Sequence, residues 1–216
     1  MKSLAIIAGA SAYKLTQTPS QPVCVYVDKA TGVERDCSAP GNSAWMDSVP
    51  YVGIEQNPEY HRNFFANFYF MQRGTGNQGY DVSNEHPDLI QEIPTIDYRS
   101  DSQFVGVNVS QQRDKFAMKI NGVMDIKESG EYTFYTKSDD GSRLWVDGEV
   151  IVDNWGLHGV REKSGKIVLH QGVHSINVDF FENFGGAYLT AEYSGPDTKG
   201  EKALVEGWHK EVLEGE

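Results

Sequence analysis

The second half of the chain alternates apolar and polar residues with a period of two. In the segment 173–180, the even-numbered residues from His174 to Phe180 fall on one face of an extended chain, and the polar residues between them fall on the other. Segments 132–135 and 188–193 alternate in the same way. Because side chains on a strand point to opposite faces in turn, this pattern predicts half-buried antiparallel strands.

Turn signals separate these segments. Asp147-Gly148 lies between the apolar runs 144–146 and 149–152, a pair of features that predicts a tight β-hairpin. Gln171-Gly172 separates 167–169 from the strand that follows, and convincing helical periodicity is nearly absent. Many short strands joined by regular turns favour a β-sandwich or barrel, and 216 residues suffice for one such domain.

The charge balance narrows the classes of partner. The chain has 31 acidic and 19 basic residues, a formal charge of −12. Nucleic-acid binding depends on Lys and Arg, so a nucleic-acid partner is not expected. An acidic surface suits divalent cations. No apolar run approaches the roughly 18 residues that span a bilayer, so no membrane span is expected.

The N-terminus has the pattern of an export signal. Lys2 precedes a short apolar run at 4–10, and Ala10-Ser11-Ala12 fits the small-x-small cleavage rule. We therefore expect residues 1–12 to be a signal peptide, a mature start at Tyr13 and a secreted protein. The alternative is an ordinary apolar N-terminal strand.

Two cysteines fit an extracellular protein. Cys24 and Cys37 flank two short runs, 25–27 and 33–35. The interval between the two cysteines is centred at Ala30-Thr31, so a hairpin turn there would place the cysteines opposite each other. A disulfide would close a small loop worth about 3 kcal/mol; the alternative is two buried thiols. We assign this hairpin to an N-terminal extension, residues 13–60. Asn108-Val109-Ser110 is a glycosylation sequon if the chain follows a eukaryotic secretory route.

Several motifs do not support catalysis or nucleotide binding. The glycines from Gly74 to Gly79 match a dinucleotide fingerprint, but the residues after them do not begin the helix that this chemistry needs. The six histidines show neither metal-ligand spacing nor a partner nucleophile. The loop around Trp155 and His158 is expected to be packed rather than catalytic. We therefore expect a protein that is not an enzyme; the alternative is an enzyme or an enzyme's appended domain.

The adjacent carboxylates Asp139 and Asp140 leave two interpretations open. They are either a solvated Asp-Gly turn or half of a calcium site, since calcium takes six to eight oxygen ligands. Consecutive side chains on a regular strand point to opposite faces, so these two converge only if the backbone turns sharply between them. A cis peptide would produce such a turn. The residues alone favour the solvated turn.

The ordered blocks around this pair resemble a known family. The run 130–136 and the following SDDGSRLWVDG at 138–148 resemble the core of the protective-antigen-type domain, PA14. Further blocks at 153–158, 169–174 and 181–187 match in order, and the resemblance extends over about 62–198. It implies an all-β, antiparallel β-sandwich of jelly-roll type at 61–198. Outside the resemblance, residues 199–216 are charged and weakly periodic, and we expect them to be a C-terminal tail, either a short helix or a linker into a partner. Such domains are usually extracellular and occur in adhesins, carbohydrate-active enzymes and toxins.

The lectin-like members of this family imply a specific site. In them, two consecutive aspartates joined by a cis peptide bind calcium, a second loop adds ligands, and two sugar hydroxyls complete the shell. Carried onto this chain, the implied metal ligands are Asp139, Asp140, Asn183 and Gly185. The implied sugar-contacting residues are Asp139, Asp140, Trp155, Glu182 and Phe184, although a core role for Trp155 stays open. Phe184 departs from the pattern, because a smaller or polar residue there would leave more room for a sugar.

These observations lead to two hypotheses. The first is a secreted calcium-dependent carbohydrate-binding module, a lectin or adhesin whose partners are glycans or glycoproteins and whose weak sites act by multivalency. The second is a structural or assembly subunit of an extracellular surface or filament without sugar-binding activity. The extra N-terminal hairpin and the charged tail favour the second, because they offer surfaces for self-assembly or attachment. Many family members keep the Asp-Asp-Gly turn without shown lectin activity.

Overall fold

The computed structural model describes the backbone and side chains of most of the chain from residue 54 to residue 210. The described ranges are 54–56, 60–71, 79–82, 85–107 and 113–210, although the side chains of residues 56, 105–107 and 210 lie outside the description. For the N-terminal part, only the backbone of four strands is described: β1 (Leu4–Ala8), β2 (Ser11–Thr18), β3 (Gln21–Val27) and β4 (Glu34–Asp36). Among all the residues that the structure describes, no helix is long and apolar enough to cross a bilayer.

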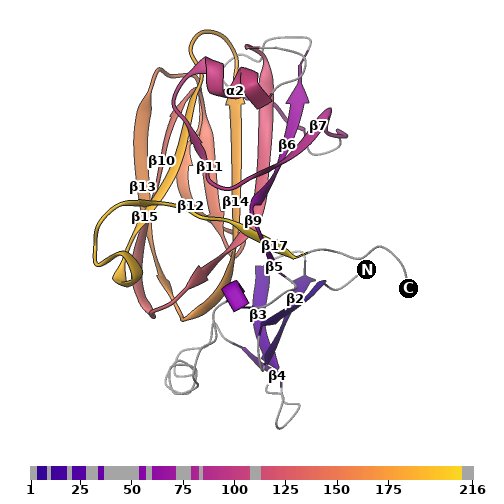
Figure 1. The fold of residues 1–216 in the computed structure, drawn as a ribbon, viewed down its shortest axis with the longest axis vertical. Helices are drawn as coiled ribbons and strands as arrows, with labels where there is room; N and C mark the ends of the chain where they lie inside the picture. Colours follow the sequence, from indigo (N-terminus) through magenta and orange to yellow (C-terminus); the bar gives the residue numbers. More distant parts are fainter. Residues whose placement is uncertain are drawn as a thin grey trace.

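Two antiparallel sheets form a sandwich (Figure 1). The larger sheet has the strand order β12-β11-β14-β9-β17-β5, with β6 paired to β9 and β7 paired to β6. Its strands are β5 (Tyr60–Arg62), β6 (Phe64–Phe70), β7 (Leu89–Ile93), β9 (Phe116–Ile126), β11 (Ser142–Val146), β12 (Glu149–Asn154), β14 (Gly172–Glu182) and β17 (Trp208–Lys210). This arrangement confirms the predicted antiparallel β-sandwich.

The second sheet faces the first. It has the order β13-β10-β15-β16, with β8 paired to β15. Its strands are β8 (Asp97–Tyr98), β10 (Gly130–Asp139), β13 (Arg161–Leu169), β15 (Tyr188–Ser194) and β16 (Ala203–Leu204). Three short helical segments, η1 (Ile54–Gln56), α2 (Asp101–Val107) and η2 (Pro196–Thr198), lie outside the sheets.

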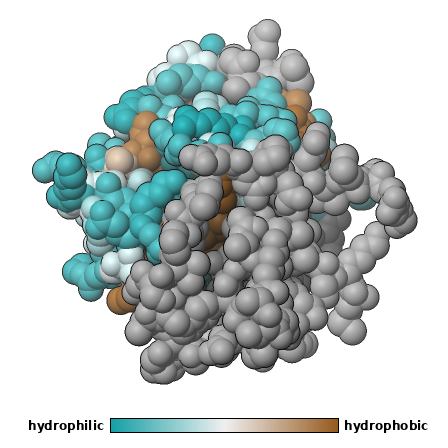
Figure 2. Space-filling model, turned by 60° about the horizontal axis from the view of Figure 1, so that its bottom comes forward, coloured by the Kyte–Doolittle hydropathy of each residue, from teal (hydrophilic) through white to brown (hydrophobic). Residues whose placement is uncertain are grey.

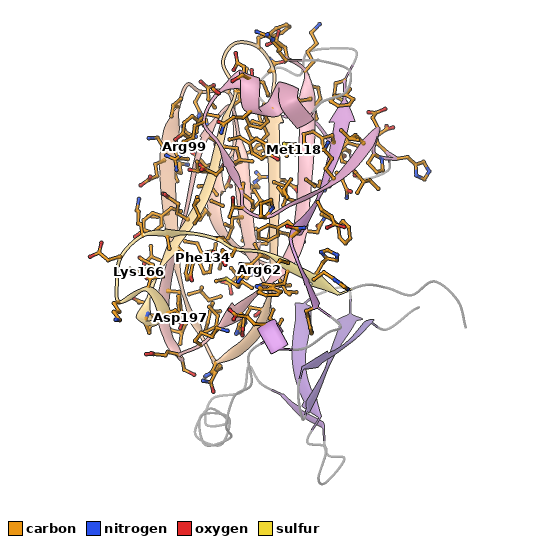
Figure 3. All side chains as sticks on the ribbon, viewed as in Figure 1. Arg62, Arg99, Met118, Phe134, Lys166 and Asp197 are labelled. Carbon is orange, nitrogen blue, oxygen red and sulfur yellow. The ribbon has the colours of Figure 1, made fainter. Side chains whose placement is uncertain are left out.

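The predicted alternation builds the core between the sheets. On β14, Ile176, Val178 and Phe180 are fully or almost fully buried. Phe134 from the facing sheet and Met118 from β9 belong to the same apolar cluster, and Figure 3 labels both in the layer of side chains between the sheets. Complete burial of each large apolar side chain contributes about 1.5 to 3 kcal/mol to folding. Together these side chains hold the two sheets together.

The Asp147-Gly148 hairpin forms as predicted. Asp147 and Gly148 both have positive φ, 49° and 83°, as a two-residue hairpin turn of this kind requires. Asp147 Oδ2 lies 2.6 Å from Nδ1 of His174, and Asp147 Oδ1 accepts a hydrogen bond of 2.8 Å from the Ser175 amide. The turn is therefore fixed to the neighbouring strand β14.

The expected charged tail belongs in part to the sandwich. β16 pairs with β15, and β17 pairs with β5 and β9. Val205 is fully buried, and Trp208 joins Ile54 and Tyr60 in a small apolar cluster. The strands of the sandwich therefore continue past residue 199, where we expect the tail to begin, as far as residue 210, because apolar residues within the charged stretch cover the sheet. At the other end, we expect the N-terminal extension to end at residue 60, but Ile54 packs in the same apolar cluster as Trp208 of the sandwich.

The N-terminal strands form a sheet of their own in the order β1-β2-β3-β4. Residues 4–8 pair with β2 as the alternative of an apolar strand anticipates, and cleavage of residues 1–12 would remove β1 from this sheet. Cleavage stays a prediction. β3 and β4 pair with Val25 opposite Asp36, the register expected of the hairpin. Cys37 and the side chain of Cys24 lie outside the described residues, as do Asn108 and residues 74–78 of the glycine loop, so the disulfide and the glycosylation also stay predictions.

The outer surface agrees with the acidic composition. On the face drawn in Figure 2, the described residues are mostly hydrophilic and their hydrophobic patches are small and separate. Six large apolar side chains are exposed among the described residues: Ile90, Val150, Leu157, Val160, Val168 and Phe184. Three of these, Leu157, Val160 and Phe184, belong to the loops beside the Asp139–Asp140 turn.

Candidate metal centre

The Asp139–Asp140 turn joins β10 to β11 and has the sharp backbone reversal that convergence of the two side chains requires. The peptide bond between the two residues is cis. Carboxylate oxygens of Asp139, Asp140 and Glu182 all lie within 4.8 Å of one another. The two consecutive aspartates therefore share a site, contrary to the solvated turn that the residues alone favour.

Gly141 allows this turn to pack against its surroundings. A Cβ atom at position 141 would lie 2.3 Å from the ring of Phe181 and 2.9 Å from the backbone nitrogen of Gly156. The backbone oxygen of Gly141 accepts a hydrogen bond of 3.0 Å from the Phe181 amide. The glycine of the Asp-Asp-Gly motif is therefore required by the close approach of two neighbouring segments.

Glu182 closes the acidic cluster from the end of β14. It is completely buried, and its Oε2 accepts a hydrogen bond of 3.0 Å from the Asp140 amide. Its Oε1 is buried and has no hydrogen-bond partner among the described residues. Burial, followed by the charges of Asp140 and Asp139, raises the pKa of Glu182 to about 9. Without a cation, Glu182 is therefore protonated at neutral pH.

Asp140 connects two loops to the cluster. Its Oδ1 accepts a hydrogen bond of 3.0 Å from the His158 amide, and its Oδ2 accepts one of 3.0 Å from the Asn183 amide. The residue itself is buried. For Asp139, burial and the charge of Asp140 raise the pKa above its ordinary value. The raised pKa values of Asp139 and Glu182 thus have the same causes, burial first and the neighbouring negative charges second.

A buried polar network supports the turn from below. Ser142 Oγ lies 2.8 Å from Ser138 Oγ and donates to Thr136 Oγ1 at 3.0 Å. The side-chain Nδ2 of Asn154 donates to Ser138 Oγ at 3.1 Å, and Asn154 Oδ1 accepts from Arg161 Nε at 2.8 Å. A satisfied network in a buried setting holds its members in one arrangement. This network fixes the strand ends from which the two aspartates project.

The predicted second loop lies beside the cluster. The backbone oxygen of Asn183 accepts a hydrogen bond of 3.2 Å from the Lys115 amide, and the Gly185 amide donates to Asp114 Oδ1 at 3.1 Å. Of the two predicted ligands, Asn183 contacts the cluster through its backbone amide, which donates to Asp140 Oδ2 at 3.0 Å, whereas the amide of Gly185 contacts Asp114. Their roles as metal ligands stay predictions.

Trp155 and Phe184 differ in their surroundings. The Trp155 ring lies 4.7 Å from the Phe181 ring and 4.7 Å from the guanidinium carbon of Arg143, so two neighbours contact it and the core role left open by the sequence fits better. Phe184 is 60% exposed, with Lys115 Nζ 5.2 Å from its ring centroid. Of the two aromatic residues, Phe184 is therefore the one free to meet a ligand.

Other residues near the cluster escaped the sequence analysis. Asp101 Oδ1 accepts a hydrogen bond of 2.6 Å from the Ala187 amide. Burial, with the charges of Glu182, Asp140 and Asp114, raises the pKa of Tyr80 to about 12. These residues come from segments that are distant in sequence from Asp139, and no local spacing connects them to it. Only the path of the folded chain brings them together.

His158 has a structural role in the adjacent loop. Its Nδ1 lies 2.9 Å from the Gly159 oxygen, and its Nε2 lies 2.9 Å from the Asn154 oxygen. Both ring nitrogens therefore contact backbone carbonyl groups, as expected of a packed loop.

Comparison with known proteins agrees with this fold. The family model of the PA14 domain matches residues 76–207. The anti-sigma-I factor RsgI3 of Acetivibrio thermocellus is 34% identical over 76 residues, which cover 35% of this chain and 12% of that protein. The chain thus matches only a small part of its curated relative.

Two solved structures show the same architecture at low identity. A PA14 sugar-binding domain from an RTX adhesin has a TM-score of 0.57 and 19% identity, covering 68% of this chain and 98% of the domain. The A domain of epithelial adhesin 9 from Candida glabrata, in complex with Galb1-3GlcNAc, has a TM-score of 0.55 and 9% identity, covering 74% of this chain and 94% of that domain. By the family match over more than half of its length, the chain belongs to the PA14 domain family.

Proposed function

We propose that this protein is a secreted, calcium-dependent carbohydrate-binding module. The observation that carries the proposal is the convergence of Asp139, Asp140 and Glu182, together with the buried Oε1 of Glu182 that no described residue hydrogen-bonds. A buried polar atom without a partner is costly, and a cation beside it would remove the cost. A set of donors made only of carboxylate oxygens suits a hard cation such as calcium.

Asp139, Asp140 and Glu182 would hold the ion, with oxygen atoms of loop 183–187 as further candidates. Calcium takes six to eight oxygen ligands, so three carboxylates leave coordination positions for a ligand. When bound, calcium would supply a site for two neighbouring hydroxyl groups of a sugar. This chain's own residues bring the three carboxylates together and exclude water from Glu182, and the exposed ring of Phe184 follows two residues after Glu182 in the chain.

Two kinds of evidence support a glycan as the ligand. The RTX adhesin domain is described as sugar-binding, and the epithelial adhesin 9 domain is described in complex with a galactose-containing disaccharide. Both share this chain's fold, and an exposed aromatic ring next to a polar site is a common platform for an apolar sugar face. A shallow site gives weak binding, so multivalent display would supply useful strength.

The second candidate is a structural or assembly subunit. The N-terminal sheet β1-β2-β3-β4 lies outside the residues that the family model matches, and it offers an additional attachment surface. In this role the acidic cluster would bind calcium to stabilise the loops, or bind no ion, and no sugar would be recognised.

A glycan screen with and without a chelator separates the two functions. Purified protein is tested for calcium binding by isothermal titration calorimetry and then on a glycan array in calcium or EDTA. We expect glycan binding that requires calcium and is lost in Asp139→Asn. Glu149→Gln is the matched control, because it changes one acidic residue at the far end of the β11–β12 hairpin. Calcium binding without any bound glycan would favour the structural role, and the absence of both would refute the proposed function.

A further inference from the structure

Loop 183–187, between β14 and β15, is held through alternate backbone amides. The amide of Asn183 donates to Asp140 Oδ2 at 3.0 Å, that of Gly185 to Asp114 Oδ1 at 3.1 Å, and that of Ala187 to Asp101 Oδ1 at 2.6 Å. The amides of the two intervening residues, 184 and 186, donate to no described residue. Three carboxylates from three separate parts of the chain therefore fix this one loop.

Asp101 and Asp114 stand on well-anchored segments. Asp101 begins α2, where the Phe104 ring is buried and stacks on Phe180 at 5.4 Å between ring centroids. Asp114 lies two residues before β9, whose first residue, Phe116, is buried in the core. Hydrogen bonds to ionised carboxylates are stronger than neutral ones. The loop is thus attached to the rigid sandwich by strong contacts on both sides of its exposed tip at Phe184.

We propose that Asp101 and Asp114 are positioning residues that hold loop 183–187 in place and thereby set the affinity of the Asp139–Asp140–Glu182 cluster for a divalent cation. The proposal rests on the proposed function, because it assumes that this cluster binds the cation. Its physical basis is preorganisation: a loop that is ordered before binding does not have to lose its freedom when the ion arrives.

Position and charge are two ways in which these carboxylates could act, and they can be separated by substitution. Asparagine retains an oxygen that accepts the amide hydrogen bond but removes the charge, whereas alanine removes both. If position matters, Asp114→Asn and Asp101→Asn keep most of the calcium affinity that the alanine variants lose. If the two residues act only by attracting the cation, both kinds of variant are equally weak.

The test measures calcium binding and amide exchange in the full chain. Calcium alone is titrated calorimetrically into the wild type and into the Asp101 and Asp114 variants, with Glu149→Gln as the control. We expect each alanine substitution to weaken calcium binding about 10- to 100-fold, the usual range for groups that orient metal ligands. Hydrogen exchange without calcium should be slow at the amides of 183, 185 and 187, and faster at those of 184 and 186.

The outcomes distinguish this inference from the proposed function. Alanine variants that bind calcium as the wild type does, or asparagine variants as weak as the alanine ones, would overturn the positioning role. Uniformly fast exchange across 183–187 would overturn it as well, and this measurement on the wild type serves even if an alanine variant fails to fold. If the wild type binds no calcium, the proposed function fails and the affinity claim with it, while the exchange pattern still decides whether the carboxylates hold the loop.

Discussion

Replacing Glu182 with glutamine should have opposite effects on the metal-free and the calcium-loaded protein. In the metal-free protein, burial and the neighbouring aspartates raise the pKa of Glu182 to about 9 from an ordinary 4.5. Folding therefore requires this carboxyl to take up a proton at neutral pH. Glutamine has the same shape, needs no proton, and can still accept the hydrogen bond from the Asp140 amide.

The size of the effect follows from proton linkage. The folded state binds more protons than the unfolded state between pH 4.5 and about 9, so stability falls as pH rises through this interval. At about 1.4 kcal/mol per pH unit, the interval from pH 4.5 to pH 7 gives an upper limit of about 3 to 4 kcal/mol. Water entry and local relaxation reduce such costs, so we expect Glu182→Gln to stabilise the metal-free protein by about 1 to 2 kcal/mol.

Urea unfolding in EDTA, followed by tryptophan fluorescence from pH 5 to pH 9, measures this difference directly. The wild type should lose stability across the range, and Glu182→Gln should show a flatter profile. With calcium at about 100 times its dissociation constant, the wild type should gain about 2.7 kcal/mol, and Glu182→Gln much less. A glutamine variant that is less stable than wild type in EDTA, or that keeps the full calcium stabilisation, would refute this reasoning.

Three further predictions concern other parts of the molecule. For the pair of His174 and Asp147, burial opposes both charges, but their mutual attraction raises the pKa of His174 and lowers that of Asp147. The pair should stabilise the fold fully between about pH 3.8 and 6.5, and this stabilisation should decrease above pH 6.5. Urea unfolding at several pH values, in the Glu182→Gln background, should show that Asp147→Asn abolishes this decrease. Phe184→Ala should weaken glycan binding about 2- to 10-fold on the array with no change in melting temperature, since this ring is exposed. Non-reducing mass spectrometry should find Cys24 joined to Cys37, and reduction should cost about 3 kcal/mol of stability.

The fold could be predicted from the sequence because its cause is local. Alternation along 173–180 and the Asp147-Gly148 turn each act within a few residues, and both formed as predicted. The short strands β16 and β17 could not be predicted because apolar residues are sparse there. Val205 and Trp208 lie among charged residues, and their burial depends on strands much earlier in the chain. Periodicity reports the face that a strand buries, but it does not report that a short strand fills a place in a distant sheet.

The candidate site, too, could be predicted from the sequence only in part. Adjacent Asp139 and Asp140 identified the turn, but residues alone gave no reason for the two side chains to converge. Glu182 completes the cluster from β14. It accepts a hydrogen bond from the amide of Asp140, which lies 42 residues earlier in the chain. Its raised pKa is a property of the folded chain, since burial contributes most to it and the charges of Asp140 and Asp139 come second. A site made of like charges is stable only if something compensates them, a proton at low pH or a cation at higher pH. Proton and calcium should therefore compete for the same three carboxylates, and calcium affinity should rise with pH up to about 9.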